Sequence, residues 1–364
     1  MPGFGETAQR RLAAARVLVV GAGGLGSASI PYLAAAGIGT IGVIDSDVVE
    51  LSNLHRQVSH ALSDVGRDKV DSIAETVAAI DPEIDVIRHR LWVDSSNILD
   101  ILADYDLVLD GSDNFPTRYL TNDAAALQHK PLVWGAILRY SGQASVAWAD
   151  YGPNYRDLFP VPPAPGDVLS CSSGGVLPSV CAAIGAIMSS ETVKLITGIG
   201  EPLLGRVTTY DALTGRYREI EYSRVPDAEP ISSLIDYAVF CGIAPDTDAA
   251  EDVADTIGPD EDIDVYELSR RLDAGQPMQL VDVREPFEAA IVRIEGSDLI
   301  PLGSLDGALE RIRRDVPVVV YCHHGPRSGR AAQFLREQGF HDVHNLLGGI
   351  DAYATQVDST LARY

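Results

Sequence analysis

The sequence predicts an α/β protein of two domains, the first of them built on a mostly parallel sheet. Its 364 residues exceed the usual size of a single hydrophobic core. Strand-like apolar runs alternate with helical patterns over residues 15–146, which is typical of βαβ units. An acidic stretch at residues 245–262 interrupts the alternation, which resumes over residues 263–364. We therefore expect domains at residues 1–244 and 263–364, joined by an acidic linker.

The first predicted strand, residues 17–20, runs directly into a glycine-rich turn. Its glycines are Gly21, Gly23, Gly24 and Gly26. An Ala-rich helical pattern follows, so the order is strand, tight turn and helix. Glycines let a phosphate approach the backbone, and the start of a helix offers free N–H groups and a positive dipole end. The turn therefore predicts a phosphate-binding loop, with a glycine-rich turn that binds nothing as the alternative.

The second apolar run, residues 41–44, ends in Asp45, nineteen residues after Gly26. An acidic side chain at this distance can bind the ribose hydroxyls of a nucleotide. The strand, the helix and the spaced acid together favour a Rossmann-like nucleotide site over an empty turn. The pattern does not decide which nucleotide binds.

Shorter patterns predict the remaining elements of the first domain. Strands are expected at residues 85–89, 107–109, 132–135 and 143–149, and a helix at residues 69–79. An antiparallel direction for the last strand is left open. We also expect a long loop at residues 154–173, an apolar helix at 176–196 and a hairpin at 206–222.

The second domain repeats the α/β pattern on a smaller scale. We expect helices at residues 265–273 and 328–338, and strands at residues 279–283, 316–321 and 343–347. The middle strand ends at Cys322, directly before a loop and a helix.

Composition excludes several classes of protein. The net charge of −24 opposes binding to the phosphate backbone of nucleic acids. No window approaches the apolar length of a membrane span, and residues 1–16 lack the apolar core of a secretory signal. The four cysteines are widely spaced and form no disulfide framework. We therefore expect a cytoplasmic protein with no nucleic-acid or membrane partner.

Polar residues that suit a nucleoside triphosphate follow the predicted strands. Asn53 and Arg56 come shortly after Asp45, Lys69 opens a helix, and Asp113 follows another strand. An acid for the ribose, an amide and two cations for phosphates, and an acid for a metal form a set suited to ATP with Mg²⁺. Taken singly, Arg56 or Lys69 would be read as a charge on a solvated helix. Together with the glycine turn they indicate an ATP site.

The motifs GAGGLG, SNLHRQ and SDN, with the Asp45 region and Lys69, resemble those of the bacterial ubiquitin-activating-like enzymes, the activators of molybdopterin and thiamine sulfur carriers. The resemblance covers about residues 3–242. It implies a homodimer whose substrate is a small ubiquitin-fold protein ending in Gly-Gly. The carrier's terminal carboxylate attacks the α-phosphate of ATP, an acyl adenylate forms and pyrophosphate leaves, with fixed cations stabilising the developing charge.

The resemblance also implies a role for each residue. Asp45 holds the ribose, the phosphates contact Asn53, Arg56 and Lys69, and Asp113 binds Mg²⁺. Relatives often carry two CxxC pairs for structural zinc, but this chain has NYRD at residues 154–157 and no cysteine near residues 226–230. We therefore expect no zinc site.

Relatives usually supply an arginine to the neighbouring subunit's ATP from a segment upstream of the one that matches Met1. Three alternatives remain: the true start lies upstream, catalysis is weakened, or a residue such as Arg10 or Arg11 substitutes.

One loop cysteine of the first domain is a candidate nucleophile. Cys171 lies in LSCSSGGV, just before a helix, where free N–H groups favour a thiolate. It matches the loop cysteine with which some relatives form an acyl thioester or acyl disulfide; a merely exposed thiol is the alternative. Cys181 and Cys241 are expected to be structural.

Cys322 opens the segment CHHGPRS before a helix. Such a loop points successive backbone N–H groups inward at an anionic sulfur, and Arg327 adds positive potential. His323 and His324 either bind the anion of a sulfur donor or face solvent, and we expect the latter for at least one of them.

Residues 263–364 resemble rhodanese domains, with LVDVREPFE, LIPLGSL, CxxxxR and NLLGGIDAY in order. The resemblance implies that Cys322 carries sulfane sulfur as a persulfide, and that Asp282 and Arg284 hold the fold around the loop. Pro326 is unusual there, because it removes one N–H donor.

The fused order predicts one enzyme that adenylates a carrier and then delivers sulfur to it as a thiocarboxylate. The sulfur donor is thiosulfate or a cysteine desulfurase persulfide, and Cys171 could resolve an acyl disulfide. Two alternatives remain at this point, an NAD-dependent oxidoreductase and a non-catalytic scaffold that binds the carrier and ATP.

Overall fold

The computed structural model describes residues 4–163, 175–226, 228–242 and 262–362. The chain divides into two compact units, Met1–Asp246 and Thr247–Tyr364. Both units alternate helices and strands, which confirms the predicted α/β class. The expected linker lies almost wholly outside the described residues.

Unit 1 contains an eight-stranded sheet in the order β3-β2-β1-β4-β5-β6-β7-β8. The strands are β1 (Arg16–Val20), β2 (Thr40–Ile44), β3 (Asp85–His89), β4 (Leu107–Asp110), β5 (Leu132–Leu138), β6 (Ser141–Ala147), β7 (Arg206–Asp211) and β8 (Arg216–Glu221). The strands from β3 to β5 in this order are parallel, and β6, β7 and β8 continue the sheet in antiparallel fashion. The strand that was expected at residues 143–149 is therefore antiparallel.

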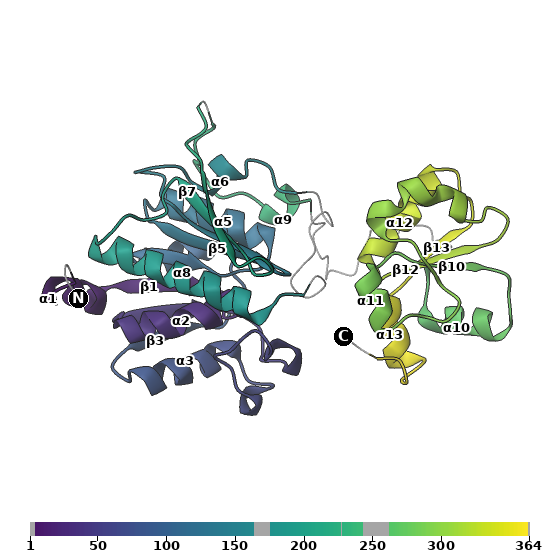
Figure 1. Cartoon of the computed structure of the whole chain (residues 1–364), viewed down its shortest axis with the longest axis horizontal. Helices are drawn as coiled ribbons and strands as arrows, with labels where there is room; N and C mark the ends of the chain where they lie inside the picture. Colours follow the sequence, from purple (N-terminus) through teal and green to yellow (C-terminus); the bar gives the residue numbers. More distant parts are fainter. Residues whose placement is uncertain (1–3, 164–174, 227, 243–261, 363–364) are drawn as a thin grey trace. The chain divides into compact units, whose positions relative to one another are not determined.

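Helices cover both faces of this sheet. They are α1 (Glu6–Ala14), α2 (Gly24–Ala36), α3 (Lys69–Ile80), α4 (Ile98–Ala103), α5 (Phe115–Leu127), α6 (Tyr155–Leu158), α8 (Pro178–Thr197) and α9 (Tyr237–Phe240), with the 3₁₀ turns η1 (Leu51–Asn53) and η2 (Leu62–Asp64). Figure 1 shows α2, α3 and α8 side by side over one face, where they enclose one core. Helices α4, α5, α6 and α9 enclose a second core on the other face.

Two expectations for unit 1 need correction. The loop expected at residues 154–173 contains the short helix α6, because Asn154 caps it by accepting a hydrogen bond from Arg156 N–H at 2.8 Å. Helix α8 has the length and mean hydropathy, 1.4, of a membrane span, although no such window was expected. Half of that window is buried within the fold, where α8 packs on α2, so α8 is a core helix.

The contact between α2 and α8 is close because both helices present small residues. A β-carbon at Gly185 would lie 2.7 Å from Ala28 Cβ, too near for any larger residue. A hydrogen bond also joins the two helices, since Ser189 Oγ donates to Ser29 O at 3.0 Å. This packing fixes the helix that begins at the glycine turn.

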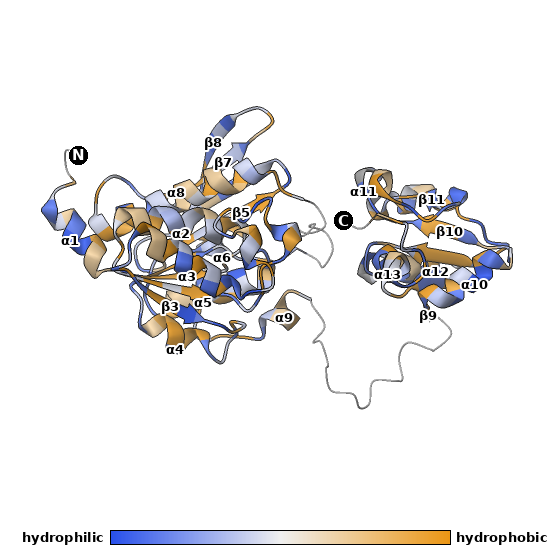
Figure 2. Cartoon of the chain, turned by 90° about the horizontal axis from the view of Figure 1, so that it is seen from below, coloured by the Kyte–Doolittle hydropathy of each residue, from blue (hydrophilic) through white to orange (hydrophobic). Residues whose placement is uncertain are grey.

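Unit 2 contains a five-stranded parallel sheet in the order β11-β10-β12-β13-β9. The strands are β9 (Asp262–Ile263), β10 (Gln279–Asp282), β11 (Asp298–Leu299), β12 (Val318–Tyr321) and β13 (Val343–Leu346). The helices are α10 (Val265–Asp273), α11 (Pro286–Ile291), α12 (Pro326–Glu337) and α13 (Gly349–Gln356), with 3₁₀ turns η3 (Leu302–Ser304) and η4 (Asp306–Arg311). Figure 2 shows hydrophobic residues gathered in the central strands, between two cores of buried side chains.

Candidate functional site

The glycine turn of unit 1 joins β1 to α2 at the carboxyl edge of the parallel strands. Gly21 has φ +91°, a conformation that glycine adopts without strain. A β-carbon at Gly26 would lie 1.9 Å from Gly21 O, so only glycine lets α2 begin this close to the turn. Open α/β sheets bind ligands at this edge.

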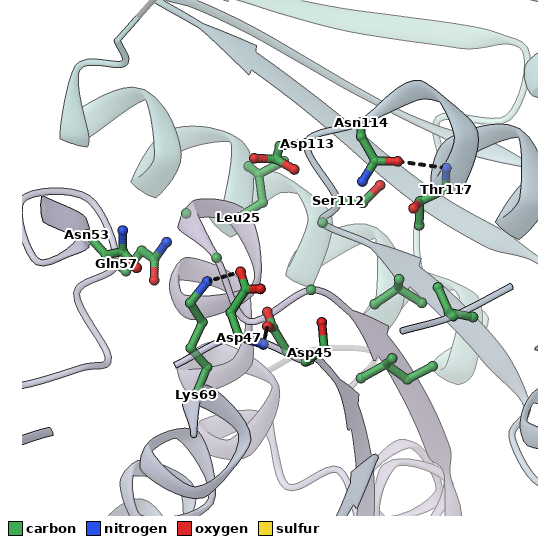
Figure 3. Close-up of a pocket in the computed structure, with 18 of the residues that line it drawn as sticks. Leu25, Asp45, Asp47, Asn53, Gln57, Lys69, Ser112, Asp113, Asn114 and Thr117 are labelled. Atoms are coloured by element: carbon green, nitrogen blue, oxygen red, sulfur yellow. Dashed lines mark hydrogen bonds and ion pairs between the residues drawn. The ribbon is translucent and has the colours of Figure 1, made fainter. Parts of the chain in front are cut away.

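A cleft opens over this turn, and we call it the glycine-turn cleft. Eight residues that the sequence indicates for nucleotide binding line it: Gly21, Gly23, Gly24, Asp45, Asn53, Arg56, Lys69 and Asp113. Gly26 does not line it and instead packs α2 against the turn. Figure 3 shows Lys69 in contact with Asp47 and near Asp45, while Asp113 lies apart from them.

Asp45 follows β2 and is tied to the glycine turn. Its carboxylate accepts hydrogen bonds from Ala22 N–H at 2.8 Å and from Asp47 N–H at 2.9 Å. Burial raises the pKa of Asp45, and the positive charge of Lys69 opposes that rise. Each oxygen keeps a lone pair that can accept a further hydrogen bond.

Lys69 is the first residue of α3 and is almost wholly buried. Its Nζ lies 2.7 Å from Asp47 Oδ2, a pairing that sequence analysis did not anticipate. Asp47 itself is mostly exposed, so the pair presents a positive group from inside the cleft and a negative group at its rim.

The segment at residues 51–57 brings an amide, a guanidinium and a second amide to the cleft. Asn53 is buried, and Arg56 Nη1 donates to Ser52 O at 3.3 Å. Gln57, which sequence analysis missed, is buried with no hydrogen-bond partner for its Oε1. A buried polar atom without a partner at a cleft suggests a ligand contact.

The segment after β4 supplies the opposite wall. Asp113 is exposed, while Ser112 and Arg118 are further residues that sequence analysis missed. Ser112 Oγ and Arg118 Nε are buried and lack partners. Asn114 caps α5 by accepting a hydrogen bond from Thr117 N–H at 2.9 Å. No sequence spacing identifies Ser112 or Arg118 as binding residues, so only their position on the cleft does so.

The second candidate site is the loop between β12 and α12 in unit 2. Cys322 is buried, and its Sγ accepts hydrogen bonds from Gly325 N–H at 3.1 Å and from Ser328 Oγ at 3.4 Å. The outward carbonyls of the loop are tied to the start of α13. Ile350 N–H donates to Cys322 O at 2.9 Å, and Asp351 N–H donates to His323 O at 3.1 Å.

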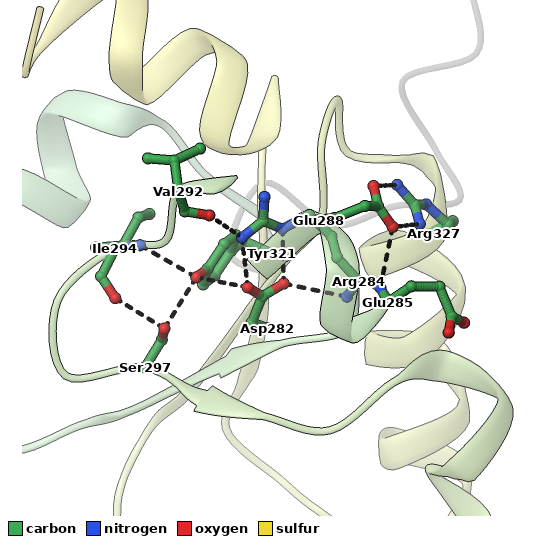
Figure 4. A network of polar contacts seen from close by, with 9 residues as sticks. All are labelled: Asp282, Arg284, Glu285, Glu288, Val292, Ile294, Ser297, Tyr321 and Arg327. Atoms are coloured by element: carbon green, nitrogen blue, oxygen red, sulfur yellow. Dashed lines mark hydrogen bonds and ion pairs between the residues drawn. The ribbon is translucent and has the colours of Figure 1, made fainter. Parts of the chain in front are cut away.

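Arg327 forms a largely buried ion pair with Glu288 of α11. Its guanidinium donates two hydrogen bonds of 2.7 Å to Glu288, which is fully buried and lies thirty-nine residues earlier. Glu288 also accepts from Glu285 N–H at 2.9 Å (Figure 4). The pair anchors the first turn of α12 to α11.

Asp282 and Arg284 form a buried pair beneath the loop. Arg284 Nε and Nη2 donate to Asp282 at 2.8 and 2.5 Å, and Tyr321 OH donates to Asp282 Oδ2 at 3.0 Å. Figure 4 shows this network joining β10 to β12, directly before Cys322.

The two histidines of the loop differ. His324 is exposed, as we expected for at least one of them, whereas His323 is buried. Burial, followed by the neighbouring His324, lowers the pKa of His323 to about 4. His323 is therefore neutral at neutral pH.

The remaining cysteines divide between the described and the undescribed parts of the chain. Cys181 and Cys241 are buried, as expected of structural residues, and burial raises the pKa of Cys241 to about 11. Cys171 lies outside the described residues. Within residues 4–163, 175–226, 228–242 and 262–362, no group of three His, Cys, Asp or Glu side chains could hold a metal ion.

Two family descriptions match this chain in the order of its units. Residues 1–230 match the ThiF family, and residues 264–356 match the rhodanese-like domain. The chain belongs to the ThiF family. Its C-terminal unit is a rhodanese-like domain, so both resemblances drawn from the sequence are confirmed.

Relatives with both domains cover the whole chain. The chain is 48% identical over 370 residues to "Probable adenylyltransferase/sulfurtransferase MoeZ" of Mycobacterium tuberculosis, covering 100% of this chain and 93% of that protein. It is 39% identical to "Adenylyltransferase and sulfurtransferase MOCS3" of Drosophila yakuba, covering 100% and 83%. This ThiF-family chain is therefore an adenylyltransferase and sulfurtransferase, and the oxidoreductase and scaffold alternatives are set aside.

Solved structures share the fold of the ThiF unit. A crystal structure of E. coli MccB has a TM-score of 0.56 and 21% identity, over 62% of this chain and 66% of that one. A crystal structure of MccB with ATP has a TM-score of 0.53 and 22% identity, over 62% and 68%. At this identity the likeness concerns the fold alone.

Proposed function

We propose that this ThiF-family chain uses ATP and Mg²⁺ to adenylate the C-terminal Gly-Gly carboxylate of a ubiquitin-fold sulfur carrier. Sulfur carried on Cys322 then converts the activated carboxylate to a thiocarboxylate. In this proposal residues 1–244 adenylate, residues 245–262 link, and residues 263–364 transfer sulfur. The protein works in the cytoplasm, without a nucleic-acid or membrane partner.

One observation carries the first half of the proposal. Eight residues separated by up to ninety-two positions line one cleft, and that cleft also holds three buried polar atoms without partners: Gln57 Oε1, Ser112 Oγ and Arg118 Nε. A ligand with both acceptors and donors, such as a nucleotide, would satisfy all three atoms.

Each part of the nucleotide has its own contacts in the glycine-turn cleft. Asp45 accepts hydrogen bonds from the ribose, while Gly21, Gly23 and Gly24 present backbone N–H groups to phosphates at the start of α2. Lys69 reaches the phosphates from α3, with Arg56 and Asn53 on the adjoining wall. Asp113 supplies the exposed carboxylate that a hard divalent cation prefers; bound there, Mg²⁺ would neutralise phosphate charge.

The adenylation step is an in-line displacement at phosphorus. A carboxylate oxygen of the carrier bonds to the α-phosphorus, the bond to the bridging oxygen of pyrophosphate breaks, and pyrophosphate leaves with the negative charge. Lys69 and Arg56 stabilise that charge.

Sulfur transfer begins at Cys322. Its thiolate attacks the sulfane sulfur of thiosulfate and releases sulfite, or takes sulfur from a desulfurase persulfide and releases that enzyme's cysteine thiolate. Gly325 N–H and Ser328 Oγ, which contact Sγ, stabilise negative charge on the cysteine sulfur. Arg327, bound to Glu288, contributes positive potential and fixes the start of α12.

The persulfide then attacks the acyl carbon of the adenylate, and AMP leaves. A thiol attacks the Cys322 sulfur of the resulting acyl disulfide, which releases the carrier thiocarboxylate and leaves a protein disulfide. We propose Cys171 as that thiol. An external dithiol supplies the two electrons that restore both cysteines.

We also propose a homodimer. Aliphatic side chains are exposed along residues 48–65, beside the glycine-turn cleft: Val48, Leu51, Val58, Leu62 and Val65. A surface of this kind is typical of a protein interface.

The experiment is the intact mass of purified Gly-Gly carriers after incubation with this protein, Mg²⁺, ATP and thiosulfate. Replacement of one carrier oxygen by sulfur is expected, with the change lost in Cys322→Ala. Cys241→Ala is the matched control, because that cysteine is buried in the other unit. A carrier that stays unchanged, with no pyrophosphate released, would refute the proposed function.

A further inference from the structure

His60 lies behind the glycine turn and outside the set of residues that line the cleft. The side chain is 7% exposed and makes two hydrogen bonds. Its Nε2 lies 3.1 Å from Ala22 O, and its Nδ1 lies 2.8 Å from Ser72 Oγ. Neither the sequence motifs nor the adenylation chemistry above gives this residue a role.

The partners of the ring decide where its proton lies. A carbonyl oxygen only accepts, so Nε2 must donate to Ala22 O. Burial lowers the pKa of His60, which favours the neutral ring with its proton on Nε2, and Nδ1 then faces the Ser72 hydroxyl at 2.8 Å. Ser72 Oγ also donates to Asp64 Oδ2 at 2.8 Å, so the single hydroxyl proton has two acceptors, Asp64 and His60. The donation from His60 Nε2 to Ala22 O does not depend on which of the two receives that proton.

The hydrogen bond from His60 Nε2 to Ala22 O sets the direction of one peptide group in the turn. In a planar trans peptide the carbonyl and the next N–H point in opposite directions. Since Ala22 O faces His60, Gly23 N–H faces away from it, and Gly23 lines the cleft. No hydrogen bond among the described residues uses Gly23 N–H.

The glycines of the turn do not by themselves fix the orientation of the Ala22–Gly23 peptide. Glycine adopts a wide range of backbone angles, so the Ala22–Gly23 peptide could rotate. Asp45 holds Ala22 N–H at 2.8 Å on one side, and His60 holds Ala22 O on the other. Helix α3 carries Lys69, which lines the cleft, and one turn later Ser72, which contacts the His60 ring.

We infer that His60 is a positioning residue for nucleotide binding, which holds the Ala22–Gly23 peptide so that Gly23 N–H points at a phosphate. The inference rests on the proposed use of ATP and deepens it. His60 touches no substrate and acts only through the Ala22 carbonyl.

Two substitutions separate this role from simple packing. In His60→Gln the amide Nε2 occupies the place of the ring Nε2 and still donates to Ala22 O. In His60→Asn the shorter amide corresponds to Nδ1 and cannot reach that carbonyl. Calorimetric titration of the full chain with ATP and Mg²⁺, and separately with adenosine, measures both effects.

The expected result is specific to the phosphates. His60→Asn should weaken ATP binding about 3- to 10-fold, the size of one neutral hydrogen bond, and leave adenosine binding unchanged. His60→Gln should bind ATP within about twofold of the natural protein. ATP affinity unchanged in His60→Asn, or ATP and adenosine weakened equally, would overturn the inference.

Ser72→Ala provides an independent test should His60→Asn fail to fold. It removes the hydroxyl that orients the ring, and a loss of about 2- to 3-fold in ATP affinity alone is expected. No change in ATP affinity would overturn the inference. Absence of ATP binding in the natural protein would instead refute the proposed function, so the two failures are distinct.

Discussion

Arg156→Met is expected to lower the free energy of unfolding of unit 1 by about 3 kcal/mol. Asp123 is 1% exposed, and Arg156 donates two hydrogen bonds to it, at 2.8 and 2.6 Å. Breaking a buried ion pair by removing one partner costs about 3–5 kcal/mol, because the remaining charge stays buried. The Arg156 side chain is 23% exposed, so water reaches the vacated site and the lower end of that range applies.

Urea unfolding followed by tryptophan fluorescence measures this change, because all three tryptophans lie in unit 1. With a slope of about 2 kcal/mol per molar, the midpoint should fall by about 1.5 M. Arg10→Met is the matched control. Its pair with Glu6 is 78% exposed on both sides, and a surface pair contributes about 0–1 kcal/mol. A midpoint for Arg156→Met equal to that of Arg10→Met would refute the reasoning.

The same experiment bears on the zinc prediction. Asp157 accepts a hydrogen bond from Val225 N–H at 2.8 Å, which joins the two places where the family resemblance would put zinc-binding cysteines. The Asp123–Arg156 pair adjoins this link. We expect these polar contacts to act where relatives use a metal, so EDTA should leave the midpoint of the natural protein unchanged. A lower midpoint in EDTA would contradict the prediction.

Three further predictions concern the two sites. Lys69→Met should lower kcat/KM for carrier-dependent pyrophosphate release about 10²–10³-fold, with Lys130→Met as control; an unchanged rate would contradict the proposed phosphate contact. Gly26→Ala should prevent ATP binding, since its β-carbon would lie 1.9 Å from Gly21 O; titration checks this, and retained affinity would contradict it. Because the pKa of His323 falls from 6.5 to about 4 on folding, the unfolded chain binds more protons between those values, so unit 2 should lose stability as pH falls from about 6.5 to 4. Circular dichroism melting of His323→Gln should lack that slope.

Much of the fold follows from the sequence because its central strands are buried on both faces. Parallel strands of this kind read as continuous apolar runs, and β1 and β2 lie within a residue of their expected bounds. Helix α1, with Ala8 and Leu12 as its buried residues, gives too narrow an apolar stripe to be singled out. Strand β8 is exposed along its whole length and was identified only through its turn.

Site residues were predictable where they stand at a fixed distance in the sequence from a strand or helix. They were not predictable where only a tertiary contact brings them to the site. The glycines, Asp45 and Cys322 stand at set distances from strands and helices. Glu288, in contrast, meets Arg327 across thirty-nine residues, and no local pattern signals that meeting. Gln57 is similar, because its importance comes from a buried oxygen without a partner rather than from its residue type.

The two sites use one physical device on unrelated loops. In each, backbone carbonyls are bound from behind, so that the N–H groups of the same peptides point to the opposite side of the loop. In unit 1, His60 binds Ala22 O behind a turn that would receive phosphates. In unit 2, the start of α13 binds the carbonyls of Cys322 and His323, and a β-carbon at Gly349 would lie 2.4 Å from each of them. We propose that the residues behind each loop set the direction of the N–H groups that would meet an anion, and substitutions there should weaken anion binding before they affect the fold.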